Sequence, residues 1–238
     1  MHGVSLLKVH WPSLGMGAGI SAGVIIAMFF AYGLGIEKNQ EPTTTQQESV
    51  TQKETLGLII DNGSPVLGSK DAPITMIEFG DYQCFYCNKF YHTTEPDIMK
   101  NYVDTGKVKL VFKDFTIIGQ DSVNAAHAAH CAQEQGKFWE YHDTLYNNWA
   151  GENTGWASSK NLLGFAKQVN LNEEQFNQCM IQAKYTSIVQ GSVSNARELS
   201  LSGTPDFFII GTDNSVTKVV GAQPYEVFDE IFKSNLGK

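Results

Sequence analysis

The amino-acid sequence predicts an α/β domain built from a βαβ half, a helical insertion and a ββα half. Two apolar, β-branched runs, 74–79 and 108–112, have strand length and flank a helical stretch. Helical spacing then persists from 121 to 200, and strand patterns return only near the C-terminus. Because strand, helix and strand follow one another, the first half predicts a parallel pair with a right-handed crossover.

An apolar segment precedes this domain. No Asp, Glu, Lys or Arg occurs from Val9 to Ile36, and roughly 20 apolar residues are enough for a helix to cross a bilayer. After a short segment of residues 1–12, we expect residues 13–36 to form one transmembrane helix that anchors the protein. A cleaved signal peptide is the alternative, because Ala31-Tyr32-Gly33 fits a cleavage site with small residues.

Residues 37–60 connect the anchor to the domain. Residues 37–54 are polar, rich in Thr and Gln, and lack aromatic side chains. Such a segment cannot bury enough apolar surface to offset its ordering entropy. We expect a flexible tether, with residues 56–60 either a short strand or the end of the tether. The folded domain then extends from 61 to 238.

Each element of the domain has its own signal. The first helix is expected from 85 to 103, with an interruption at Pro96, because a proline disfavours helical dihedrals at the preceding Glu95. In the insertion, Asp121-Ser122 and Asn172 are candidate helix caps. The last half is predicted as two strands and a helix, at 207–210, 216–220 and 224–235.

The sequence Cys84-Phe85-Tyr86-Cys87 follows the first strand and opens the first helix. Residues three apart on a helical turn lie on one face, so the two sulfurs are close enough to bond. At the helix N-terminus Cys84 meets unsatisfied N–H groups and the positive end of the dipole, which lower the pKa of a thiol. We predict thiol–disulfide exchange, with Cys84 as the nucleophile and Cys87 as the buried resolving thiol.

Two other interpretations of this pair stay open. A C-x-x-C pair is also half of a zinc site. The other half would come from His127, His130 and Cys131, whose spacing places them on one helical face. A metal-binding or metal-delivery module is therefore a second class of function. A purely structural Cys84–Cys87 disulfide is the third, although closing so small a loop constrains the chain little.

The run from Ile74 to Asn88, ITMIEFGDYQCFYCN, resembles the active-site segment of the DsbA-like branch of the thioredoxin superfamily. The helical insertion and the turn Gly203-Thr204-Pro205 before a strand are similar to that family too. The resemblance extends from about Pro65 to the C-terminus. It implies a thioredoxin fold, Cys84 as nucleophile and Cys87 as its partner.

The resemblance also implies a cis Thr204-Pro205 peptide bond beside the disulfide, where backbone groups bind an incoming peptide. The alternative is an ordinary trans loop before the strand. Glu78, six residues before Cys84, matches the acidic residue that the family keeps buried behind the disulfide. A buried carboxyl has a raised pKa and can accept the proton of the resolving thiol.

A solvated strand face is the alternative environment for Glu78. Lys109 and Lys113 are its candidate charge partners. The chain departs from the family between the cysteines, where Phe85-Tyr86 stands in place of the Pro-His that oxidases of this family often carry. We expect Phe85 and Tyr86 to form part of an apolar surface for unfolded substrates. Packing against the loop at Gly203 is the other interpretation.

Cys131 and Cys179 are the two remaining cysteines. With Cys84 and Cys87 assigned to redox chemistry, they are expected to form a structural disulfide between two helices of the insertion, as in some DsbA-like proteins. Two buried free thiols are the alternative. A structural disulfide requires an oxidising compartment, which places the domain outside the cytoplasm.

These patterns predict a membrane-anchored, extracytoplasmic and monomeric oxidase that introduces disulfides into newly exported, cysteine-containing proteins. It needs no cofactor besides its Cys84–Cys87 disulfide. The resemblance implies reoxidation by a quinone-linked membrane partner of DsbB or VKOR type, and a reductase or isomerase of the same fold is the close alternative. A net charge of −8 argues against a nucleic-acid partner.

Overall fold

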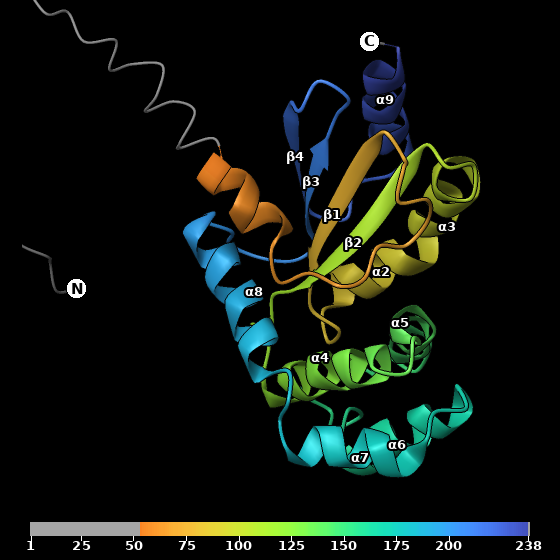
Figure 1. Cartoon of the computed structure of the whole chain (residues 1–238), viewed down its shortest axis with the longest axis vertical. Helices are drawn as coiled ribbons and strands as arrows, with labels where there is room; N and C mark the ends of the chain where they lie inside the picture. Colours follow the sequence, from red (N-terminus) through yellow and green to blue (C-terminus); the bar gives the residue numbers. More distant parts are fainter. Residues whose placement is uncertain (1–52, 238) are drawn as a thin grey trace, which may run out of the picture. The chain divides into compact units, whose positions relative to one another are not determined.

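Four strands form one mixed sheet in the order β2-β1-β3-β4 in the computed structural model, which describes residues 53–237 (Figure 1). β1 (Ile74–Gly80) pairs in parallel with β2 (Val108–Asp114). On its other side β1 pairs antiparallel with β3 (Asp206–Ile210), which pairs antiparallel with β4 (Val216–Val220). The predicted βαβ and ββα halves are therefore confirmed.

The helices follow the predicted order. α2 (Phe85–Thr93), α3 (Glu95–Ile98) and the π-helical η1 (Met99–Val103) connect β1 to β2, and α9 (Tyr225–Leu236) follows β4. The insertion consists of five helices: α4 (Gln120–Gln133), α5 (Phe138–Asn147), α6 (Ser159–Gln168), α7 (Glu173–Ile181) and α8 (Thr186–Glu198). Asn172 caps α7 as predicted, since its side chain accepts a hydrogen bond from the Gln175 N–H at 2.9 Å.

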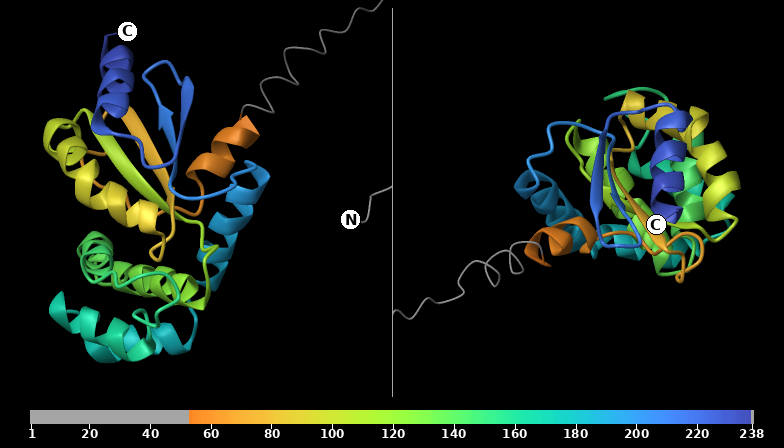
Figure 2. Two further views of the ribbon diagram at one scale, coloured as in Figure 1. Left: turned by 180° about the vertical axis from the view of Figure 1, so that it is seen from behind. Right: turned by 90° about the horizontal axis from the view of Figure 1, so that it is seen from above.

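Helices cover both faces of the sheet (Figure 2). α2, α3 and α9 pack on one face, where the rings of Phe90, Phe207 and Phe228 meet. α8 and the helical residues 53–60 pack on the other face. The helices α4 to α7 form a layer of their own, and its apolar core includes Cys84 and Cys87. The two cysteines thus lie where the sheet meets the helical insertion.

Cys131 and Cys179 form a disulfide that joins α4 to α7. This confirms the predicted structural bond within the insertion, and the alternative of two free thiols is wrong. Both sulfurs are buried in the core of the helical layer, with 1% and 3% of the residues exposed.

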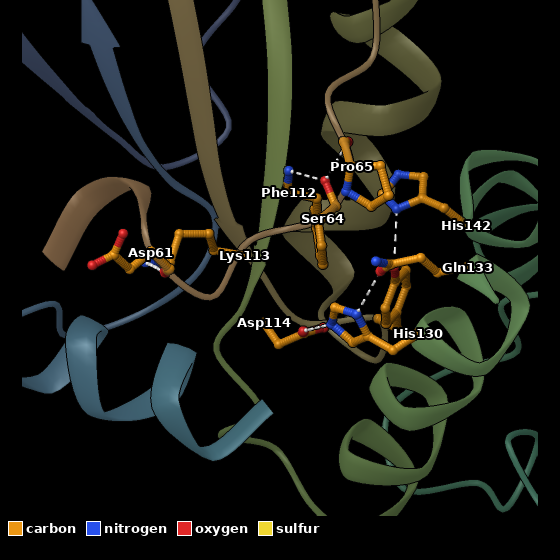
Figure 3. Close-up of polar contacts among 10 residues, drawn as sticks. Asp61, Ser64, Pro65, Phe112, Lys113, Asp114, His130, Gln133 and His142 are labelled. Carbon is orange, nitrogen blue, oxygen red and sulfur yellow. Dashed lines mark hydrogen bonds and ion pairs between the residues drawn. The ribbon is translucent and has the colours of Figure 1, made fainter. Parts of the chain in front are cut away.

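The interpretation of residues 56–60 as a strand or the end of a tether is wrong. Residues 53–60 are helical, and Ile59 is buried in the core beneath the sheet. The Lys113 ammonium group on β2 donates hydrogen bonds to the carbonyl of Leu58, at 2.6 Å, and to that of Asp61 (Figure 3). These contacts join the segment to a strand about fifty residues further along, which local sequence cannot show.

Two helix boundaries also differ from the prediction. The break before Pro96 falls at Thr94, and Glu95 is the first residue of α3, so Pro96 lies in a first turn where its missing N–H leaves no bond unmade. α4 begins at Gln120, so Asp121-Ser122 lies inside its first turn and does not cap it.

The predicted anchor at 13–36, the segment 1–12 before it and the tether up to residue 52 lie outside the described residues. Within 53–237, none of the helices combines the length and the apolar character needed to cross a bilayer.

Candidate functional site

Cys84 lies at the N-cap of α2 in an extended conformation, directly after the turn that leaves β1. The thiol is close to the loop before β3, with Sγ 3.3 Å from the Thr204 carbonyl oxygen. A hydrogen bond from the Cys87 thiol is the main reason that the pKa of Cys84 falls to about 6. Hydrogen bonds from the Thr204 side chain and from the N–H groups of Cys87 and Tyr86 lower this pKa further, while burial opposes them. Cys84 is therefore mainly a thiolate at neutral pH.

Cys87 has the opposite character. It is fully buried one turn into α2. Burial raises its pKa well above the usual range, and its hydrogen bond to Cys84 and the charges of Cys84 and Glu78 raise it further. Both thiols are free in this structure. The pair consequently consists of one ionised and one protonated sulfur that share a hydrogen bond.

The Thr204-Pro205 peptide bond is cis, as the resemblance implied. Pro205 is buried at the start of β3, and its carbonyl accepts a hydrogen bond from the Gly221 N–H at 2.8 Å. This bond holds the loop before β3 against the end of β4. Thr204 is thereby fixed beside the Cys84 thiol.

Glu78 is buried behind the cysteines, with 2% of the residue exposed, so the alternative of a solvated strand face is wrong. Burial raises the pKa of its carboxyl well above the ordinary range, and the charges of Glu95 and Cys84 raise it further. Glu78 in turn raises the pKa of Cys87. The two groups are thus within electrostatic range of each other inside the protein.

Neither candidate lysine is the charge partner of Glu78. In the parallel register Glu78 lies opposite Phe112, so both Lys109 and Lys113 project from the other face of β2. Lys109 donates to the Lys70 carbonyl at 2.9 Å. Lys113 lies over the Phe79 ring and, as described above, binds carbonyls of the N-terminal segment. The prediction failed because a shift of one residue along a strand reverses the face.

Phe85 and Tyr86 remain on the surface, with 50% and 58% of each residue exposed. Their rings contact each other, and Phe85 also contacts the ring of Trp149, which comes from the loop after α5. These three aromatic side chains, here called the aromatic rim, lie beside the nucleophile. The exposure favours the predicted apolar surface over packing against the loop at Gly203.

Several residues of the site were not singled out in the sequence. Asp81 is buried after β1, and its carboxylate accepts hydrogen bonds from the N–H groups of Gln83, Ile117 and Ile118. Burial nevertheless raises the pKa of Asp81. The sequence could have indicated this role, because Asp81 lies between an apolar strand and the cysteines and Asp side chains in turns accept hydrogen bonds from nearby N–H groups.

Gln83 is the second residue that sequence reasoning missed. It is fully buried, its side chain donates to Ser122 at 2.9 Å and accepts from the Asn153 N–H at 2.6 Å, and its carbonyl accepts from the Trp149 indole at 2.8 Å. Gln83 thereby fixes the loop at residues 148–158 to the active-site turn. No local sequence pattern predicts these contacts, because the partners of Gln83 lie far along the chain.

The residues that a metal site would need do not converge. Cys131 is bonded to Cys179, and the His130 imidazole Nε2 lies 2.7 Å from the Asp114 carboxylate (Figure 3). Among residues 53–237 no group of three or more His, Cys, Asp or Glu side chains is arranged to hold a metal ion. The set of ligands proposed from the helical spacing is therefore not assembled.

Comparison with known proteins agrees with this geometry. Residues 61–231 match the family model described as Thioredoxin, and the chain belongs to the thioredoxin family. It is 29% identical to disulfide bond formation protein D of Bacillus subtilis over 150 residues, which cover 62% of this chain and 68% of that protein.

Two crystal structures are also similar. Oxidised BdbD of Bacillus subtilis has a TM-score of 0.66 at 26% identity, covering 73% of this chain and 93% of its own. For α-DsbA1 of Wolbachia pipientis the TM-score is 0.65 at 27% identity, covering 72% and 90%. The fold, the site and these similarities define a protein disulfide oxidoreductase of DsbA-like type.

Proposed function

We propose that this chain is an extracytoplasmic dithiol oxidase that introduces disulfides into exported, cysteine-containing proteins. The opposed ionisation of its two thiols carries the proposal: the pKa of Cys84 is lowered to about 6 and that of Cys87 is raised. A stabilised Cys84 thiolate favours the reduced form of the pair. A pair whose reduced form is favoured is a strong disulfide donor.

The reaction consists of two exchanges. A substrate thiolate attacks the Cys84 sulfur of the oxidised enzyme, the Cys84–Cys87 bond breaks, and Cys87 leaves as a thiolate that takes up a proton. A second substrate thiolate then attacks the substrate sulfur of the mixed disulfide, and Cys84 leaves as a thiolate. Two electrons pass to the enzyme, which ends as a dithiol, and the substrate ends with a disulfide.

Glu78 is proposed to exchange a proton with the Cys87 sulfur. Burial raises the pKa of its carboxyl and so favours the protonated form, which can donate to the leaving Cys87 thiolate, while the carboxylate can accept the proton in the reverse direction. The exposed aromatic rim is proposed to bind apolar parts of unfolded chains. The backbone at Thr204-Pro205 is proposed to pair with the segment that carries the substrate cysteine.

The location and the partner follow from features outside the active site. A structural Cys131–Cys179 disulfide suits an oxidising compartment, which supports an extracytoplasmic domain. The apolar run at 13–36 would keep the domain at the membrane, beside a quinone-linked reoxidase of DsbB or VKOR type. Such tethering raises the effective concentration of the enzyme at its partner.

The reduction potential of the Cys84–Cys87 pair tests the proposal. The full-length chain is equilibrated with glutathione buffers of graded poise, and alkylated thiols are counted by mass spectrometry, with Cys84→Ser as the control that cannot form the bond. A value more oxidising than the glutathione couple supports the oxidase. A strongly reducing value would make the enzyme a reductase, the alternative function of the same fold. Failure to form a reversible bond contradicts both.

A further inference from the structure

A carboxylate lies at the N-terminus of the active-site helix without being part of the exchange chemistry. The Phe85 N–H, the first donor of α2 after the nucleophile, donates to the Glu152 side chain at 3.1 Å. Glu152 comes from the loop at 148–158 in the helical insertion, 67 positions along the chain. A helix N-terminus stabilises negative charge, through its free N–H groups and its dipole.

The loop places this carboxylate through several independent contacts. As described for Gln83, the Trp149 indole and the Asn153 N–H are both bonded to Gln83, on the two sides of Glu152. Trp149 also contacts the Phe85 ring. The Asn153 side chain fits against Gly119, where a Cβ atom would come within 2.4 Å of its oxygen. The position of Glu152 is therefore set by the fold, although its carboxylate is on the surface.

Two anions thus share the first turn of α2. The Cys84 thiolate is stabilised by the N–H groups of Tyr86 and Cys87, while the Glu152 carboxylate accepts a hydrogen bond from the N–H of Phe85, the residue just before them. A carboxylate repels a thiolate that forms at the same helix end. The other titratable groups beside Cys84 are Cys87, from the same helix, whose hydrogen bond lowers the pKa of Cys84, and Glu78, from β1, whose own pKa is raised by the charge of Cys84.

We propose that Glu152 is a positioning residue that restrains ionisation of the Cys84 thiol and so makes the dithiol pair less oxidising than the same helix end would be without it. The inference rests on the proposed redox function of Cys84 and Cys87. Glu152 acts through the helix N-terminus and its charge, and it exchanges no proton or electron with the substrate. An exposed charge at this position changes an equilibrium by roughly two- to fivefold.

The charge also acts on the substrate. Because Glu152 lies beside the aromatic rim, it favours a positively charged group near the substrate cysteine and disfavours a negatively charged one. A small cationic disulfide is therefore expected to react faster, relative to an anionic one, in the wild-type protein than in a variant without the charge.

The variant Glu152→Gln separates charge from structure, because the amide keeps an oxygen that can accept from the Phe85 N–H. Full-length protein is reduced, and ionisation of Cys84 is followed by thiolate absorbance against pH. We expect the acid ionisation constant of Cys84 to rise roughly two- to fivefold. The equilibrium ratio of reduced to oxidised protein in glutathione buffer should rise by the same factor. The difference should shrink in about 1 M salt, because exposed charges are screened.

Glu174→Gln is the matched control, since it removes an exposed carboxylate from the first turn of α7. It should leave Cys84 unchanged. Glu152→Ala tests the loop contact, and if it shifts ionisation while Glu152→Gln does not, the residue is only structural and the proposal is wrong. An unchanged ratio of rates with cystamine and glutathione disulfide in Glu152→Gln would also overturn it. These outcomes compare variants, so they are independent of whether the absolute potential marks an oxidase or a reductase.

Discussion

At the scale of single residues, the reactivity of the site depends on a hydrogen bond between two sulfurs. The bond from Cys87 is the largest contribution to the lowered pKa of Cys84. We therefore expect Cys87→Ala to raise the pKa of Cys84 from about 6 toward the value of a free thiol. Cys87→Ser, which keeps a donor, should raise it less. The pH dependence of alkylation at Cys84 measures both effects, and an unchanged midpoint in Cys87→Ala would contradict this account.

Glu78 is the residue whose role depends most on burial. In Glu78→Gln the amide has similar size but cannot exchange a proton, so the steps that protonate or deprotonate Cys87 should slow by about 10²-fold, as expected for a lost acid–base group. Stopped-flow measurement of the first exchange, in which a substrate thiolate attacks oxidised Cys84 and Cys87 leaves, reports this step. Release of Cys84 from the mixed disulfide should be little affected, which provides the internal control. Equal slowing of both steps would indicate a disturbed site and not a lost proton transfer.

The C-x-x-C pattern identified the two sulfurs, and the resemblance to the DsbA-like family pointed to Glu78 and Thr204-Pro205. Sequence reasoning missed Gln83 and Glu152 because their importance comes from contacts with residues about 67 to 70 positions away. It also failed to exclude Lys109 and Lys113 as charge partners of Glu78, because their position relative to Glu78 depends on the register of β1 against β2. Residues in short sequence motifs could therefore be predicted, whereas contacts between distant segments of the chain could not.

At the scale of elements, the Cys131–Cys179 bond holds α4 to α7 across 48 positions of sequence. Replacing both cysteines by Ala should lower the free energy of unfolding by about 3–4 kcal/mol, according to the chain-entropy relation for a loop of this size. Denaturant titration measures the loss. The Cys84–Cys87 pair should still form a reversible disulfide in this variant if the insertion keeps its fold. A loss below about 1 kcal/mol would mean that the apolar packing of the helical layer holds it without the disulfide.

The helical residues 53–60 depend on a different contact. Lys113 binds the carbonyls at the end of this segment, and burial lowers the pKa of its ammonium group to about 7. We expect Lys113→Met to keep the packing volume but release these carbonyls, so amide hydrogen exchange in 53–60 should accelerate. The amides of β1 serve as the reference. Equal protection in the variant and the wild type would show that the apolar packing of Leu56 and Ile59 and the hydrogen bond from Asn195 to the Asp61 carbonyl hold the segment without Lys113.

Elements with strong internal periodicity were predicted well. The four strands and the helices from α4 to α9 have the expected order, and Asn172 caps α7 as expected. The exceptions are informative. Residues 53–60 are polar only at their start, and contacts of Ile59 and Lys113 hold this helical segment against the sheet. The break at Thr94 in place of Glu95 reflects the tolerance of a helix first turn for proline.

At the scale of the whole domain, the redox pair belongs to two structural layers. Cys84 and Cys87 start a helix that packs on the sheet, yet they contribute to the core of the helical insertion. Loop 148–158 extends this arrangement to the surface through Gln83 and Glu152. The oxidation state of two sulfurs is therefore expected to influence the stability of the entire domain, since both layers pack against them.

The effect of the oxidation state on stability has a defined direction and a defined pH range. In the reduced form the folded pKa of Cys84, about 6, is below its unfolded value, so the unfolded chain binds more protons between these two values. The contribution to stability is fully present above the unfolded value and is lost as pH falls through about 6. The oxidised form has no thiol at Cys84 to titrate. Thermal unfolding of both forms should therefore show the reduced form gaining stability over the oxidised form as pH rises from 5 to 8.

The Cys84→Ser variant provides the control, because its reduced state lacks the ionising thiol while the fold is otherwise unchanged. Its melting temperature should change with pH in the same way as the melting temperature of the oxidised wild-type protein. The raised pKa of Cys87 acts in the opposite direction only above the unfolded value of a thiol, outside this window. If the difference between the two forms of the wild type stays constant from pH 5 to 8, the Cys84 thiolate is not stabilised by the fold, and the oxidase proposal loses its physical basis.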